Sequence, residues 1–201
     1  TDPEDHGSIV KSCGGCVRKA LPLINASACV FPEEDKAMAL LALRSEVKWI
    51  EDDTVLTIVG SSAPGTQVRS RCSRVRCLEW SKQKVPWGVM GTNAPSAWAH
   101  ATGRGVRVGV VDTGVNVSHP DLAGNVRAGF DAISETEGVE DDNGHGTHVA
   151  GIIAALDNGF GVVGVAPEAH IYAVKSFDSR GKGMTSDIIQ GIQWCIEQGV
   201  H

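Results

Sequence analysis

The feature that most restricts the possible folds is the segment 106–111, Val-Arg-Val-Gly-Val-Val, which is followed at once by Asp112-Thr113-Gly114. A run so rich in β-branched apolar residues is typical of a central parallel strand that is buried on both faces. Such strands occur almost only in sheets covered by helices, so the run predicts the α/β class. Asp112 would then lie at the carboxyl end of its strand, where open α/β sheets collect their functional groups.

The residues after this strand continue the α/β pattern. Residues 145–156 contain no Asp, Glu, Lys or Arg and are rich in Gly and Ala, which predicts a buried helix that its neighbours approach closely. Residues 169–177 are predicted as a strand and residues 186–198 as an amphipathic helix. The sequence stops at His201, where a βαβ unit needs its next strand, so we expect a truncated domain.

The residues before the α/β region divide into two further parts. The polar and apolar pattern of the first part predicts a small β-β-α-β unit, with strands at 8–12, 23–31 and 47–51 and a helix that begins near Pro32. An irregular, basic stretch follows and is interpreted as a linker. We therefore expect three parts: 1–59, 60–81 and 82–201.

Composition and charge argue against several classes of function. The 201 residues are 42% hydrophobic and 21% charged, as in an ordinary globular protein. The net charge of -6 argues against a nucleic-acid partner. The sequence has no run of about 18 apolar residues, so it predicts no membrane partner.

Asp112, in the context Val-Val-Asp-Thr-Gly, has three interpretations. It suits the buried carboxylate of a serine-protease triad. It also suits an aspartic protease, which needs a second such carboxylate, supplied in this case by a second copy of the chain. The third interpretation is a structural residue that caps a turn. The pentapeptide alone favours none of these over the others.

The segment Asn143-Gly144-His145-Gly146-Thr147-His148 favours the first interpretation. A triad needs a histidine whose one ring nitrogen accepts the nucleophile's proton while the other donates to a carboxylate. His145, flanked by glycines at the start of the predicted helix, suits that role. Zinc-protease helices place two histidines four residues apart with a glutamate between them, unlike His145 and His148. We expect His145 to be catalytic and His148 to be buried and hydrogen-bonded.

Three other motifs leave alternatives open. Residues 159–164 match G-x-G-x-x-G, but they follow a helix and lead into a strand, which reverses the context of a dinucleotide site. The six cysteines allow a zinc site, disulfides or unpaired thiols, of which the last is favoured, with Cys29 and Cys195 packed in apolar surroundings. The arginines within 69–76 suit a solvated linker or a protease-sensitive processing segment.

Five motifs occur in a fixed order: Val85-Pro86-Trp87-Gly88-Val89, Val110-Val111-Asp112-Thr113-Gly114, Ser118-His119-Pro120-Asp121-Leu122, Asn143-Gly144-His145-Gly146-Thr147-His148-Val149-Ala150-Gly151, and Gly164-Val165-Ala166-Pro167. With these motifs, residues 82–201 resemble the subtilisin-like serine proteases (subtilases). The resemblance implies an incomplete subtilisin-like domain, a parallel sheet flanked by helices. It also implies that Asp112 orients His145, which acts as general base and then general acid. The family's nucleophilic serine is not found in this sequence, so we expect the chain alone to be inactive.

The resemblance also implies a substrate site and a calcium site. The edge segment Gly181-Lys182-Gly183 would pair with an extended polypeptide substrate, and Phe177 and Ile188 would line a hydrophobic pocket. A structural Ca²⁺ would be bound by side-chain and main-chain oxygens of six residues: Gln83, Asp121, Leu156, Asn158, Phe160 and Val162. The alternative for this loop is a Gly-containing turn at a helix end.

Residues 8–55 resemble the later part of the subtilase propeptide, whose full order is the ferredoxin-like β-α-β-β-α-β. We expect a partial ferredoxin-like α+β propeptide without its first strand and helix, acting as an intramolecular inhibitor. The resemblance implies a secreted serine endopeptidase made as a zymogen, and an intracellular location stays open. The alternatives are a truncated pseudo-protease that serves as a calcium-binding or inhibitory module, a dimeric aspartic protease and a nucleotide-binding domain.

Overall fold

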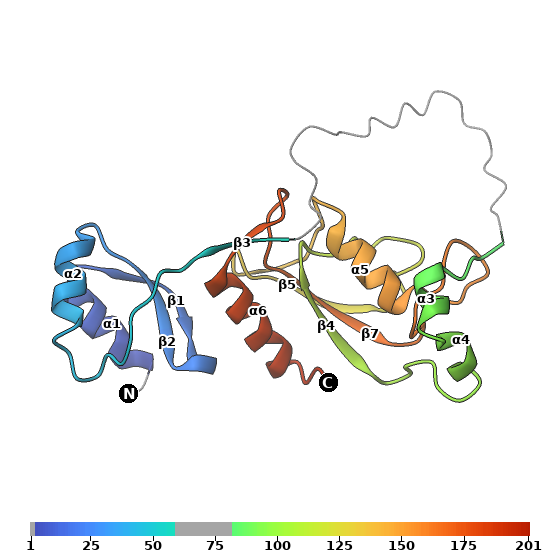
Figure 1. Ribbon diagram of the computed structural model, residues 1–201, viewed down its shortest axis with the longest axis horizontal. Coiled ribbons are helices and arrows are strands. Elements are labelled where there is room, and N and C mark those ends of the chain that lie inside the picture. Colours follow the sequence, from blue (N-terminus) through green and yellow to red (C-terminus); the bar gives the residue numbers. More distant parts are fainter. Residues whose placement is uncertain (1–2, 59–81) are drawn as a thin grey trace, which may run out of the picture.

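The computed structural model describes residues 3–58 and 82–201 (Figure 1). The predicted linker 60–81, with its arginines, lies outside the described residues. The amino-terminal part contains six elements: α1 (Pro3–Ser12), β1 (Cys16–Leu21), η1 (Pro22–Ile24), β2 (Ala26–Val30), α2 (Glu34–Leu41) and β3 (Val55–Thr57). The carboxyl-terminal part contains nine: α3 (Trp87–Gly91), α4 (Ala94–Ala97), β4 (Arg107–Asp112), β5 (Val126–Asp131), β6 (Thr136–Glu137), α5 (His145–Ala154), β7 (His170–Lys175), β8 (Lys182–Met184) and α6 (Thr185–Glu197).

The carboxyl-terminal part is built on a four-stranded sheet of order β4-β7-β5-β6. β7 is parallel to both β4 and β5, and β6 is antiparallel to β5. Val110 packs in the cluster that contains Ala150 of α5, whereas its neighbour Val111 packs with Cys195 of α6. Because successive strand residues point to opposite faces, α5 and α6 cover opposite faces of the sheet (Figure 1). The predicted α/β class, with a mostly parallel sheet flanked by helices, is confirmed.

Within the described four-stranded sheet, β4 lies at one edge and β7 lies between β4 and β5. The apolar composition of β4 agrees with its contacts to both α5 and α6. One expectation for this part is wrong. His148 is exposed, not buried, because it lies on the side of α5 that faces away from the sheet.

The amino-terminal part differs from its prediction in three ways. Residues 8–12 belong to α1, not to a strand, and this helix has Lys11 in its last turn, where a cation is favoured. The strand predicted at 47–51 is irregular, and a short strand, β3, forms at Val55–Thr57 instead. The strand β1 at Cys16–Leu21 was not predicted; it pairs with β2, and α1 precedes this hairpin.

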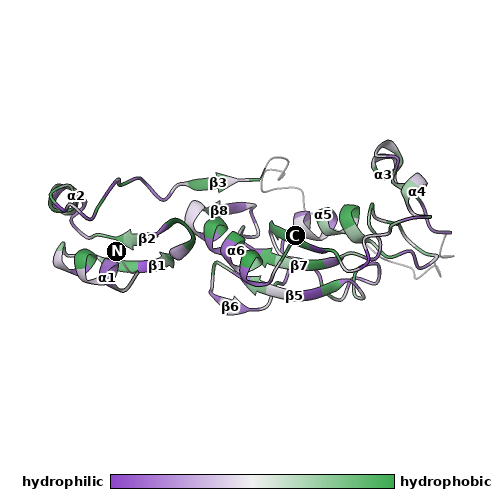
Figure 2. Cartoon of the chain, turned by 90° about the horizontal axis from the view of Figure 1, so that it is seen from below, coloured by the Kyte–Doolittle hydropathy of each residue, from purple (hydrophilic) through white to green (hydrophobic). Residues whose placement is uncertain are grey.

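The two parts are joined by a short antiparallel ladder between β3 and β8. Leu56 pairs with Gly183, and the ladder continues on both sides through hydrogen bonds from Ile58 N to Gly181 O and from Thr185 N to Thr54 O, each 2.9 Å. Figure 2 shows β3 lying over β8, with the hairpin of β1 and β2 displaced to one side of α6. In the described ranges, no helix has the length and apolar character needed to cross a bilayer.

Candidate functional site

Asp112 and His145 meet at the carboxyl end of β4. Asp112 is the last residue of that strand and His145 is the first residue of α5. The His145 Nδ1 atom lies 2.8 Å from each carboxylate oxygen of Asp112. The Asp112 side chain is 12% exposed and that of His145 is 33% exposed. The imidazole is therefore fixed through Nδ1, while Nε2 has no hydrogen-bond partner in the described parts of the chain.

Glycine permits this close approach of helix and strand. A Cβ atom at Gly146 would lie 2.1 Å from the carbonyl oxygen of Gly114 and 3.1 Å from Cβ of Asp112. Gly114 itself has φ +102°, and a Cβ there would lie 2.6 Å from the carbonyl oxygen of Val139. A side chain at either position would push α5 away from β4 and separate the imidazole from its carboxylate.

Asp141 is a structural residue of this site that the sequence analysis missed. Its carboxylate accepts hydrogen bonds from the main-chain N–H groups of Asn143, Gly144 and Thr147 and from the hydroxyl groups of Thr113 and Thr147. Burial raises the pKa of Asp141, but the bonds from Thr147, Gly144 and Thr113 outweigh that effect, so the pKa lies below its ordinary value. The carboxylate thus ties the end of β4 to the first turn of α5. An Asp shortly before an Asn-Gly turn was the available signal.

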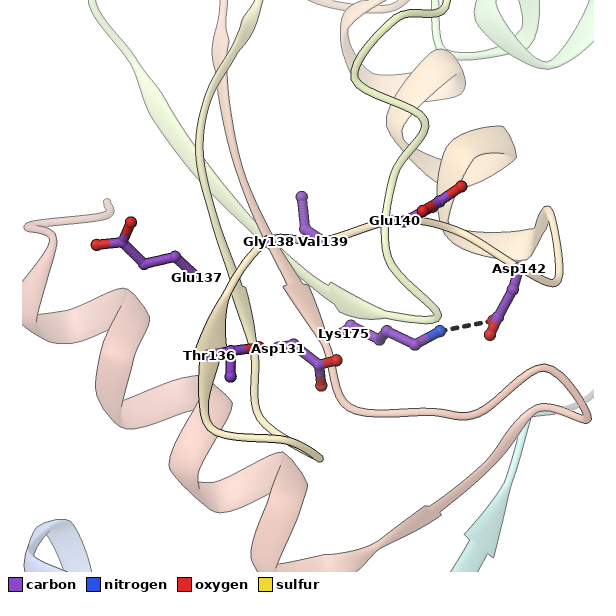
Figure 3. Close-up of a pocket in the computed structure, with 8 residues that line it drawn as sticks. All are labelled: Asp131, Thr136, Glu137, Gly138, Val139, Glu140, Asp142 and Lys175. Carbon is purple, nitrogen blue, oxygen red and sulfur yellow. Dashed lines mark hydrogen bonds and ion pairs between the residues drawn. The ribbon is translucent and has the colours of Figure 1, made fainter.

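Lys175 supports the same region from β7. Its Nζ atom donates to the carbonyl oxygen of Thr113 at 3.0 Å and to Asp142 at 2.6 Å. Figure 3 shows this side chain reaching toward Asp142 along a cavity of about 270 Å³. Neither Asp112 nor His145 lines the cavity, whose walls are formed by Asp131, Thr136, Glu137, Gly138, Val139, Glu140, Asp142 and Lys175. The cavity is therefore separate from the Asp112–His145 pair.

Part of the predicted substrate segment forms the edge strand β8, and its role in substrate binding stays a prediction. Lys182 and Gly183 belong to β8, Gly181 immediately precedes it, and Ile188 lies in α6. A Cβ at Gly183 would lie 3.0 Å from the Phe177 ring, so these two residues are neighbours. In the chain itself the edge is already paired, because β3 lies along it.

The six residues predicted to bind calcium gather around Asp121, which is 4% exposed. The Gln83 amide nitrogen lies 2.6 Å from the carbonyl oxygen of Leu156 and 3.0 Å from that of Val162. The Asp121 carboxylate accepts from Val162 N at 3.0 Å and from the Asn158 amide at 3.2 Å, and Asn158 in turn accepts from Phe160 N.

The chemistry of this donor set fits calcium. A carboxylate, two amide side chains and carbonyl oxygens are the ligands that Ca²⁺ prefers. In the described arrangement, the oxygens of the Gln83 and Asn158 amides accept from Gly159 N and Phe160 N, each at 3.1 Å. A Cβ at Gly161 would lie 2.2 Å from the Asp121 carboxylate, so the loop closes tightly around that group. Gly161 therefore serves this loop, whereas Gly164 lies against the main chain of Ala154 and Ala155 at the end of α5. The calcium site stays a prediction.

The described cysteines are unpaired. Cys13 and Cys195 are buried, Cys29 is half-buried, Cys16 is exposed, and all four carry free thiols. Burial raises the pKa of the Cys195 thiol, and burial together with nearby Cys16 raises that of Cys29. These thiols are therefore poor candidates for a nucleophile. Cys72 and Cys77 lie outside the described residues, and within those residues no three His, Cys, Asp or Glu side chains are grouped to hold a metal ion.

Comparison with known proteins agrees with this geometry. Residues 103–201 match the subtilase family, Peptidase S8. The chain is 39% identical to subtilisin E of Bacillus subtilis (strain 168) over 194 residues, which are 96% of the chain and 44% of that protein. It is 49% identical over 120 residues to subtilisin BL of Lederbergia lenta, covering 59% of the chain and 44% of that protein.

A third relative, M-protease of Shouchella clausii (strain KSM-K16), is also 49% identical over 120 residues, or 31% of its own length. The chain thus spans less than half the length of the curated relatives it matches. The matched residues include the pair formed by Asp112 and His145, its supporting glycines and the edge strand β8. The chain belongs to the subtilase family of serine peptidases.

Proposed function

We propose that this chain is the amino-terminal portion of a secreted, calcium-stabilised serine endopeptidase that is made as a zymogen. The observation that carries this proposal is the contact between Asp112 and His145 at the carboxyl end of β4, with Nδ1 2.8 Å from the carboxylate. The substrate is a polypeptide, bound in extended form along β8. An edge strand binds such a segment through main-chain hydrogen bonds.

In this proposal His145 moves the protons of the reaction. Nε2 accepts the proton of a serine hydroxyl from the remainder of the protein as the serine oxygen attacks the peptide carbonyl. The imidazolium then donates that proton to the leaving amine, and a water molecule cleaves the resulting acyl ester by the same route. Asp112 holds the ring in the required tautomer and stabilises its positive charge.

Residues 3–58 are proposed to inhibit the enzyme within the same chain. The support is the ladder between β3 and β8, because a peptide substrate and β3 would need the same edge groups. Hydrogen bonds from Ile58 N to Gly181 O and from Thr185 N to Thr54 O take up two of them. Cleavage within or after this segment would be required before a substrate could bind.

The test is turnover by the full-length protein with a peptide substrate and a serine-directed phosphonate as inhibitor. We expect His145→Ala to lower kcat by about six orders of magnitude and Asp112→Asn by about four. His148→Ala, which changes an exposed histidine on the same helix, is the control and should retain kcat within about twofold. Turnover within tenfold of wild type in either dyad variant, or inhibition by pepstatin instead of the phosphonate, would contradict the proposal.

A second candidate function is a module without turnover that inhibits a protease or binds calcium. The observation that favours it is the occupied edge of β8, which leaves the peptide-binding groups paired. The two candidates are distinguished by the reading frame after the codon for His201. A frame that continues into a Gly-Thr-Ser segment supports the endopeptidase, and a stop codon supports the module.

A further inference from the structure

A buried lysine joins the two parts of the chain. Lys19, in β1, is only 3% exposed, although lysine side chains are rarely buried. Its Nζ atom lies 2.9 Å from Asp187 Oδ1 and 2.7 Å from Gln190 Oε1, and it also donates to the carbonyl oxygen of Ala132. The carboxylate of Glu135 lies 3.6 Å away. Every one of these partners belongs to the carboxyl-terminal part.

Asp187 is equally enclosed. Its side chain is 4% exposed and lies in the first turn of α6, where a negative charge is favoured by the helix dipole. The guanidinium of Arg18 lies 3.4 Å from the same carboxylate. Removing one partner of a buried ion pair is strongly destabilising, because the other charge is left in the interior without compensation. The attachment of β1 to α6 therefore depends on both Lys19 and Asp187.

The other polar contacts between the two described parts are the ladder of β3 and β8 and hydrogen bonds to neutral groups of α6, which place no charge requirement on the partner surface. β3 is attached to β8 by main-chain hydrogen bonds, while its own side chains are exposed, 58% for Val55 and 46% for Leu56. Main-chain bonds of this kind form with almost any sequence, and selectivity comes from side chains. The Ser186 N–H and hydroxyl groups both donate to the Asp53 carboxylate, at 2.9 Å and 2.6 Å, while the ion pair of Arg18 and Asp53 lies within the amino-terminal part.

We propose that Lys19 and Asp187 determine which catalytic domain residues 3–58 can inhibit. The partner surface is the first turn of α6 in a subtilase domain that has a carboxylate at position 187. A domain with an amide or a cation at this position would leave the buried Lys19 with only the exposed carboxylate of Glu135, 3.6 Å away, and would be rejected. This inference rests on the proposed inhibitory function of residues 3–58.

The experiment measures hydrogen exchange in the 201-residue chain. The N–H groups of Thr185 and Ser186 donate across the junction to Thr54 O and Asp53 Oδ1, so their exchange reports its opening. We expect Lys19→Met and Asp187→Asn each to accelerate this exchange by about 100-fold or more, and Asp187→Lys to do so more strongly. The double variant K19M/D187N should exchange no faster than the faster single variant, because the two side chains act as one pair.

The matched control is Lys36→Met, which alters an exposed lysine of the same segment that forms a surface ion pair with Glu33. This variant should leave the exchange rates of Thr185 and Ser186 within about twofold of wild type. In every variant, the exchange rates of the amides in β4 and β7 should also stay within about twofold of wild type. The inference would be overturned if K19M and K36M accelerated exchange equally, or if the accelerations of the two single variants multiplied in the double variant. It would also be overturned if exchange in β4 and β7 accelerated as much as exchange at the junction. Because no turnover is measured, an inactive full-length enzyme would contradict the proposed function without altering this result.

Discussion

At the scale of single residues, the site depends on a carboxylate that takes no part in proton transfer. Asp141 collects hydrogen bonds from Thr113, which follows Asp112, and from the residues on both sides of His145. The position of the imidazole relative to its partner is thus set by a residue outside the predicted triad. Sequence motifs identified Asp112 and His145. The role of Asp141 could be recognised only from the hydrogen bonds that its carboxylate accepts in the folded structure.

Asp141→Asn is expected to lower the free energy of unfolding by about 1–3 kcal/mol, because it replaces an acceptor of five hydrogen bonds with a group that also carries donors. The folded-state pKa of Asp141 is depressed, so its carboxylate stabilises the fold above the unfolded-state pKa. That contribution is lost as the pH falls through the folded-state pKa. Urea unfolding of the wild type and of D141N should therefore converge under acidic conditions. Glu140→Gln, at the exposed neighbouring residue, is the control, and a pH-independent difference would contradict this assignment.

At the scale of elements, α5 shows what a local pattern can and cannot predict. Its small residues predicted a buried helix, but only the side with Gly146, Ala150 and Ala154 is buried, while His148 and Ile152 are exposed. The alternation in residues 8–12 indicated a strand, yet five residues are too few to separate the two periodicities. The last strand of the amino-terminal part was predicted at 47–51, before the observed β3, because its partner, β8, lies more than 120 residues away in the sequence. Among the described residues, Asp53 takes the place of a local cap on α6, which no local pattern could predict.

Two glycines of α5 provide a matched pair of substitutions. Gly146→Ala should destabilise the protein by about 3 kcal/mol or more, since its Cβ would meet the Gly114 carbonyl oxygen at 2.1 Å. Gly151→Ala, where a Cβ meets nothing within 4 Å, should stabilise it by about 0.5–1 kcal/mol through helix propensity. Thermal unfolding measures both. A similar melting temperature for the two variants would show that the approach of α5 to β4 is looser than described.

At the scale of the whole molecule, the fold is closed by contacts between segments far apart in the sequence. The loop around Asp121 gathers Gln83, Leu156 and Val162, and the junction of β3 with β8 joins the two parts. Family motifs in the sequence pointed to the loop. They did not point to the buried Lys19, because nothing in a local sequence distinguishes a lysine that will be enclosed from one on the surface.

Calcium is expected to raise the melting temperature of the chain by about 5–10 °C when present at about 100 times its Kd. Asp121→Asn should abolish that rise, because it removes the only carboxylate among the six predicted ligands. Asp157→Asn, which changes an exposed carboxylate beside the same loop, should retain it. Scanning calorimetry with calcium and with a chelator provides the measurement. An equal response in D121N and D157N would place any bound ion elsewhere.

The ladder between β3 and β8 is a linear series of bonds, and its two ends are not equivalent. Within residues 3–58 and 82–201, the Ile58 end is attached by a main-chain bond to Gly181. At the other end, Thr54 bonds to Thr185, and Asp53 is further held by Ser186 and Arg18. We therefore expect the ladder to open first at Ile58, and the contacts of Asp53 to open last. On this expectation, the Gly181 end of β8 separates from β3 before the amino-terminal segment detaches.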